Sequence, residues 1–227
     1  MPAATAFSEH AQRTDAQVSE TEALALARIA AAVGVAPIET VRAVMSAALE
    51  DVAREHVDEV LLQSYLFAGF PRTLNASVVW REISGIPAPT SDDAADVAQA
   101  PEWTAQGEAT CRTVYGPTYD ALRRHVARLH PALDAWMLVD GYGKVLSRPA
   151  LSLAVRERCI VAVCAAADQR PQLGSHLRGA RRCGVSDAQL EATLDAIADL
   201  ATPDAIAAAR AELARITAAH ATTTRDS

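Results

Sequence analysis

The chain has 227 residues, of which 50% are hydrophobic and 22% are charged, so it can bury a substantial core and is not disordered as a whole. Only 4% of the residues are aromatic, whereas Ala and Leu are plentiful, a bias that favours helices over sheets. The formal charge of −7 argues against nucleic acid as a partner, and no apolar run approaches the roughly 20 residues that cross a bilayer.

The first elements along the chain are a flexible arm and four helices. Residues 1–18 show no periodicity and lack the cationic start and apolar stretch of a signal peptide. Ser19, followed three positions later by Glu22, predicts a capping box that begins the first helix. The predicted helices cover residues 21–34, 37–55, 57–69 and 71–84, and Gly69 with Pro71 separates the last two.

Residues 86–102 combine Pro, Asp and Ala without periodicity, which predicts a linker between two helical parts, 19–85 and 103–220. After the linker we expect amphipathic segments over 103–113, 117–129 and 130–143, and then a turn over 143–152.

The helix expected over 153–167 is nearly all apolar, which is typical of a buried central helix. The next helix lies within 168–187, and Gly184 suits the left-handed residue that closes it. Ser186 with Gln189 predicts a second capping box. The last helices are expected over 187–201 and 203–220, before a frayed tail. No strand is predicted, so the fold class is all-α, a bundle of helical hairpins.

The two parts of the chain resemble each other weakly. When they are aligned, Glu22 falls against Glu157, Glu59 against Glu191, and Pro71 against Pro203. The shared residues are few and the segments are rich in Ala, so the sequence leaves open whether the halves are related by duplication.

Glu157 and His176 are the first candidates for chemistry. His176 shares a helix face with Gln172, Gly179, Ala180 and Cys183, and these small neighbours leave room for a packed helix or for a ligand. If Glu157 met His176 across the helical hairpin, the carboxylate would fix the imidazole tautomer and allow acid–base catalysis. Alternatively, His176 satisfies a core hydrogen bond and Glu157 pairs with a neighbouring base.

Other polar residues remain open to two interpretations. Arg178 and the nearby arginines could attract a carboxylate substrate or could form a solvated helix face. Gln63 and Tyr65 lie among Leu and Phe, so they either complete a polar network or point into a pocket. The four cysteines form no metal-binding pattern. They behave most simply as small apolar residues in a reducing, cytoplasmic environment.

A family resemblance rests on the segment "GKVLSRPALSLAVRERCIVAVCAAADQRPQLGSHLRGARRCGVSDAQL" and on "DEVLLQSYLFAGFP". Both are similar to the carboxymuconolactone decarboxylase family, which includes the alkylhydroperoxidase AhpD-like proteins. The matching features are "SRPALS" before an "RE" helix, a histidine helix and a "GVS" turn, and they cover roughly residues 20–80 and 140–203. The core of the match is expected at about 140–203, and the N-terminal half is a degenerate version of it.

The resemblance implies an all-α fold that assembles into homo-oligomers, often trimers or hexamers. It places the family's Glu on Glu157 and its His on His176, whereas the two cysteines of the peroxidase-type CxxC motif fall on Gln169 and Gln172. Glutamine supplies no thiol, so the resemblance argues against CxxC-dependent peroxidase activity.

Three functional hypotheses follow from these residues. The leading one is a decarboxylase or related lyase for a small carboxylated molecule, with His176 and Glu157 as the catalytic residues and Gln172, Gln63, Tyr65 and Arg178 binding the substrate. No cofactor and no metal are expected. The alternatives are an antioxidant protein that uses a lone thiol, Cys164 or Cys183, and a non-catalytic helical oligomer that serves as a binding module.

Overall fold

The computed structural model of the chain describes the backbone of residues 18–223 and the side chains up to residue 219. The predicted arm therefore lies, except for Val18, outside the described residues, as does the tail after residue 223. Every regular element between these limits is helical and none is a strand, which confirms the all-α class.

The N-terminal half contains α2 (Glu20–Val35), α3 (Ile38–Ala48) and α4 (Arg54–Ser84). The helix α4 is bent at Gly69, whose φ of 76° and ψ of 162° fall where a side chain would be strained, and Pro71 follows immediately. The break predicted between the third and fourth helices is therefore present, although the chain resumes a helix at once.

The middle of the chain is more irregular. Residues 85–99, which we call the connecting segment, contain only the short 3₁₀ turns η1 (Asp93–Ala95) and η2 (Val97–Gln99), so the loop ends a few residues before the predicted limit of 102. It is followed by four elements: α5 (Ala100–Tyr115), η3 (Gly116–Thr118), α6 (Tyr119–Leu129) and α7 (Pro131–Trp136).

The element after α7 is a π-helix, η4 (Met137–Val145), where the sequence suggested the end of an amphipathic segment and a turn. It packs backbone to backbone against α5. A Cβ atom built on Gly143 would lie 1.9 Å from the carbonyl oxygen of Trp103, and one on Gly107 would lie 2.2 Å from that of Leu138. Glycine is therefore required at both positions.

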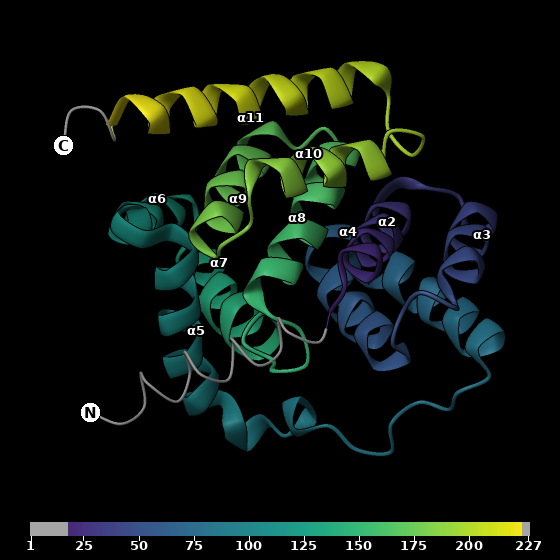
Figure 1. Cartoon of the computed structure of the whole chain (residues 1–227). Helices are drawn as coiled ribbons and strands as arrows, with labels where there is room; N and C mark the ends of the chain where they lie inside the picture. Colours follow the sequence, from purple (N-terminus) through teal and green to yellow (C-terminus); the bar gives the residue numbers. More distant parts are fainter. Residues whose placement is uncertain (1–17, 224–227) are drawn as a thin grey trace.

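The C-terminal half contains α8 (Leu153–Ala166), α9 (Arg170–Arg182), α10 (Asp187–Ala196) and α11 (Pro203–Thr223). Figure 1 shows α8 at the centre of the bundle, α11 across the top and the connecting segment along the bottom. Residues 155–165 of α8 are all buried, as expected for a central helix.

Two hydrophobic clusters form the core, and α2 packs against α8 where they meet. One cluster is built mainly from the N-terminal half and takes in Val155 and Cys159 of α8. The other is built mainly from the C-terminal half and takes in Ala27 and Ala31 of α2. Whether the two halves arose by duplication stays open.

One local expectation is wrong in part. Ser19 caps α2 by accepting a hydrogen bond from the Glu22 backbone N–H at 3.1 Å, but the Glu22 carboxylate does not complete the capping box. Its Oε1 instead accepts a hydrogen bond from the Ala53 backbone N–H at 2.8 Å, at the start of α4. The second predicted helix accordingly ends at Ala48 rather than near residue 55, because Glu22 stabilises the first turn of a new helix there.

Candidate functional site

Three consecutive charged residues, Arg156, Glu157 and Arg158, lie on the buried helix α8 and are at most 3% exposed. Because successive helical residues point about 100° apart, the three side chains enter three different regions of the protein. Arg156 donates to Glu59 at 2.6 Å, and Arg158 donates to Glu20 at 2.7 Å. These two pairs leave Glu157 as the carboxylate that faces α9.

Glu157 and His176 form a buried pair. The Nδ1 atom of His176 lies 2.9 Å from Oε2 of Glu157, with the imidazole 6% exposed and the carboxylate fully buried. A carboxylate can only accept, so Nδ1 carries the hydrogen and Nε2 is the nitrogen left to exchange protons with another molecule. The second oxygen, Oε1, has no hydrogen-bond partner among the described residues.

Gly179, one turn beyond His176, permits this approach. A Cβ atom at Gly179 would lie 2.7 Å from Oε2 of Glu157, so a larger residue would displace the carboxylate. The small residues that share a helix face with His176 therefore leave space for the carboxylate of Glu157.

Aromatic rings surround the imidazole. Phe67 meets it edge to face with ring centroids 6.0 Å apart, and Tyr115 does so at 6.5 Å. Tyr115 also contacts Tyr142 of the π-helix at 6.0 Å, and burial raises the pKa of Tyr115 to about 12. Sequence reasoning missed both tyrosines, because no local pattern links the end of α5 or an irregular π-helix to a histidine on α9.

A small pocket of about 200 Å³ lies one helical turn from His176. Phe67 connects the two, since its ring contacts the imidazole and also lines the pocket. Gln172 and Gln169, which the sequence resemblance aligns with the CxxC cysteines, contribute exposed amides. The full lining comprises Leu66, Phe67, Val163, Cys164, Ala167, Gln169 and Gln172.

Cys164 is the thiol in this pocket. Burial, and secondarily the charge of Glu157, raises its pKa to about 12, so the thiol stays protonated near neutral pH. No disulfide joins the four cysteines, all of which lie in the described part of the chain.

Gln63 and Tyr65 do not line this pocket. Gln63 is 3% exposed and donates to the carbonyl oxygen of Arg156 at 3.0 Å, so it belongs to the polar network of Arg156 and Glu59. Tyr65 stacks on Phe70 at 5.0 Å and lines a separate cavity. Of the two interpretations that the sequence left open, Gln63 follows the first and Tyr65 the second.

Arg178 lies on another face of α9 from His176, because the two are two positions apart and this corresponds to about 200° around the helix. It donates to the carbonyl oxygen of Gly174 at 2.6 Å and lies 3.6 Å from Glu212.

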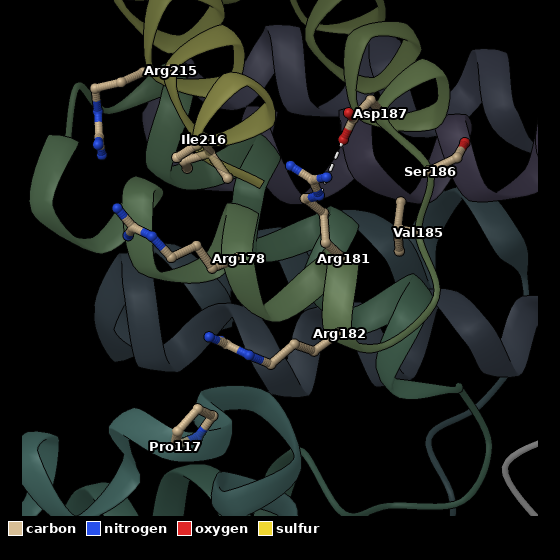
Figure 2. Close-up of a pocket in the computed structure, with 10 residues that line it drawn as sticks. Pro117, Arg178, Arg181, Arg182, Val185, Ser186, Asp187, Arg215 and Ile216 are labelled. Carbon is tan, nitrogen blue, oxygen red and sulfur yellow. Dashed lines mark ion pairs between the residues drawn. The ribbon is translucent and has the colours of Figure 1, made fainter. Parts of the chain in front are cut away.

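Figure 2 shows the groove of about 730 Å³ that Arg178 lines together with Arg181, Arg182 and Arg215. Arg181 is ion-paired there with Asp187, and Arg215 with Glu212. Asp187 and Glu212 thus neutralise about half of the positive charge of the four arginines, and Arg182 donates to the backbone carbonyl of Val114.

Neither a metal cluster nor a spanning helix is found where the structure is described. Between residues 18 and 219, no three His, Cys, Asp or Glu side chains are grouped so that they could hold a metal ion. None of the helices in this part of the chain is long and apolar enough to cross a membrane.

Comparison with known proteins finds a sequence family that is similar to the part of the chain carrying this pair. Residues 131–220, which include both Glu157 and His176, match the model of the Carboxymuconolactone decarboxylase family. The chain is also 33% identical over 135 residues to a protein of Schizosaccharomyces pombe named "Peroxisomal protein 2". That match covers 58% of this chain and 62% of the relative, and no solved structure matches.

Proposed function

We propose, because residues 131–220 match the carboxymuconolactone decarboxylase family, that the chain is a lyase of the decarboxylase type. Its substrate is a small carboxylated organic molecule. The observation that supports the proposal most is the buried pair of Glu157 and His176, with its 2.9 Å contact through Nδ1.

The pair is suited to proton transfer. Glu157 fixes the tautomer with Nδ1 protonated and holds the ring in one orientation. His176 then acts as the general acid or base through Nε2, and Glu157 is its positioning residue. Exclusion of water by Phe67 and Tyr115 strengthens the electrostatic interaction between the two groups.

The proposed reaction breaks one carbon–carbon bond and forms one carbon–hydrogen bond. The bond between the substrate and its carboxylate breaks, carbon dioxide leaves, and the electron pair moves into an adjacent carbonyl, such as that of a lactone. The resulting carbanion-like carbon takes a proton from Nε2 of the imidazolium form of His176, which solvent then reprotonates.

The pocket beside Gln172 fits a small substrate. Its apolar wall can hold a carbon skeleton, while the amides of Gln169 and Gln172 can hydrogen-bond polar substituents. The lining contains no guanidinium group, so Arg178 has no part in this proposal and its predicted role in substrate binding stays a prediction. The same applies to Gln63 and Tyr65.

Thiol chemistry is a weaker alternative. Gln169 and Gln172 stand where the peroxidase-type relatives keep cysteines, and the raised pKa of Cys164 leaves little thiolate. A lone-thiol antioxidant function therefore has less physical support than proton transfer.

The test measures carbon dioxide release from a panel of carboxylated lactones and β-keto acids by the full-length protein. We expect His176→Ala to lower turnover by about 10²- to 10⁴-fold, and Glu157→Gln to lower it as well, because the imidazole loses its charged partner. The matched control is Glu22→Gln, which changes the carboxylate of the protein's other buried Glu–His pair and should leave turnover unchanged.

Equal turnover by the wild type, His176→Ala and Glu157→Gln would exclude the proposed chemistry. If neither the wild type nor any variant consumes any of the acids, the hypothesis of a non-catalytic binding module gains support. The homo-oligomer, trimer or hexamer, and the cytoplasmic location stay predictions; the name of the relative associates that protein with the peroxisome.

A further inference from the structure

A second cavity, of about 420 Å³, lies between α4, the connecting segment and the π-helix. It shares no lining residue with the pocket beside Gln172. Its volume falls within the range of about 300–1,000 Å³ that is usual for small-molecule sites. The cavity is therefore separate from the proposed lyase site and large enough for a ligand.

The cavity wall is mainly apolar. Leu61 and Val145 are buried beneath it, while Leu62 and Phe70 remain 43% and 63% exposed. Tyr65 stacks on Phe70 and extends this surface. Large apolar side chains that gather around a hollow and stay in contact with water are typical of a binding site.

The acidic groups at the cavity already have cationic partners. Asp58 is paired with Arg81 at 2.5 Å. Both oxygens of Asp92 accept hydrogen bonds from Arg148, at 2.9 and 2.8 Å. The two carboxylates in the lining are therefore each held by a guanidinium group.

Within the described residues, Lys144 is not held by an ion pair of this kind, although its charge contributes, after Arg148, to the lowered pKa of Asp92. Its ammonium group lies 4.9 Å from the centre of the Trp103 ring, and between residues 18 and 219 it forms no ion pair with a carboxylate. Lys144 is half-buried and lines this cavity and also a neighbouring one of about 450 Å³, to which Trp103 belongs. Because no ion pair holds its ammonium group in the described part of the chain, its positive charge can meet an anionic ligand at this edge of the cavity.

Lys144 is also unusual in the chain. It is the single lysine among 21 basic residues, and every other one is arginine. A lysine carries a compact charge with three donors, so it can pair with a carboxylate as a point charge without the fixed geometry of a guanidinium fork. Lys144 lies on a π-helix, an irregularity often found at functional sites.

Thr73 adds a polar group to the apolar side. It lines the cavity at 8% exposure, and its hydroxyl has no hydrogen-bond partner in the described structure. An unpaired hydroxyl at the wall of the cavity is a second indication that a bound molecule supplies the missing hydrogen-bond partner.

We propose that this cavity binds a small monocarboxylic acid with an apolar body, of the size of an arylalkanoic acid. Its carboxylate pairs with Lys144, and its body covers Leu62, Phe70 and the Tyr65 ring. The site is independent of His176, so it does not require the proposed lyase reaction.

The test compares 4-phenylbutyrate with its neutral amide by isothermal titration calorimetry on the full-length protein. We expect the acid to bind about tenfold or more tightly than the amide, because only the acid can pair with Lys144. Lys144→Met, which keeps the apolar stem, should remove this preference without changing the affinity for the amide. Lys144→Arg should retain part of it, and Thr73→Val should weaken both ligands slightly.

The single lysine offers an independent measurement. Acetylation of Lys144 by an amine-reactive reagent, followed by mass spectrometry, should be slowed by 4-phenylbutyrate and not by the amide. His176→Ala should bind the acid as the wild type does, so failure of the lyase proposal leaves this result unaffected. Three outcomes would overturn the proposed site: equal affinity for the acid and the amide, no binding of either ligand, or protection of Lys144 that depends only on protein concentration. The last outcome would indicate that a second copy of the chain occupies the cavity.

Discussion

Two buried carboxylate–histidine pairs occur in the part of the chain that the structure describes, and they differ in the other contacts that the carboxylate makes. In the N-terminal half, Oε1 of Glu22 lies 2.8 Å from Nδ1 of His56 and also accepts the backbone N–H of Ala53. In the C-terminal half, Glu157 meets Nδ1 of His176 at a similar 2.9 Å, yet its other oxygen has no partner in the described structure.

The surroundings sharpen the difference. Glu22 anchors the first turn of α4, so its contacts are accounted for by helix stability. His176 is instead enclosed by Phe67 and Tyr115 beside a pocket. Two pairs of similar geometry therefore differ in their surroundings. The unused acceptor oxygen of Glu157 and the adjoining pocket favour Glu157 and His176 as the candidates for chemistry.

The largest effect on stability should come from a third buried carboxylate, Glu59, whose contacts all serve to hold the fold together. It pairs with Arg156 at 2.6 Å and with Arg148 at 2.7 Å. Glu59→Gln should lower the free energy of unfolding at pH 7 by about 3 kcal/mol, because it leaves the buried Arg156 without its countercharge. Urea unfolding measures this, with Glu191→Gln on the surface as the control.

Glu59 should also make the stability of the protein depend on pH. Burial acts to raise the pKa of Glu59, but its interactions with Arg148 and Arg156 outweigh burial, and the folded-state pKa is lowered. The stability from this network is thus present above the ordinary value of 4.5 and is lost as the pH falls through the lowered pKa. Acidification should therefore destabilise the wild type more than Glu59→Gln; an equal loss in both would contradict the assignment.

Glu22→Ala tests the structural pair directly. It should lower the free energy of unfolding by about 1–3 kcal/mol, because the Ala53 N–H and His56 both lose their acceptor. Glu22→Gln, which retains Oε1, should remain closer to the wild type. Turnover should be unaffected by either change, and a loss comparable to that of Glu157→Gln would mean that the two pairs do not differ in function.

The smallest expected response is at Cys164, beside the catalytic candidate. With its pKa raised to about 12 by burial and by the charge of Glu157, it should react with iodoacetamide at pH 8 roughly a thousandfold more slowly than an exposed thiol. Mass spectrometry of the native and urea-unfolded protein measures this difference. Rapid alkylation of native Cys164 would revive the lone-thiol hypothesis.

Local hydrogen bonding made several elements predictable. Ser186 and Gln189 form the expected capping box, Gly184 adopts a φ of 93°, and the last helix begins at Pro203. Each of these features depends on residues within four positions of one another, so neighbours in the sequence carry the necessary information.

Part of the candidate site was also accessible from the sequence. Glu157 and His176 were paired through their family spacing, and the small residues on the histidine face were recognised as room for a neighbour. The sequence also marks Gln63 and Tyr65 as polar residues in an apolar helix, but helical periodicity does not predict which residues of other helices they contact.

The sequence by itself determined the all-α class, the helix ends that have local caps, and the absence of cysteines at positions 169 and 172. Only the tertiary structure decided that Glu22 meets His56 rather than its own helix end, and that Tyr65 and Lys144 line one cavity. The physical reason is distance along the chain: Tyr65 and Lys144 come together only because α4 and the π-helix pack around the same core. Side-chain contacts of that kind follow from packing and not from helical periodicity.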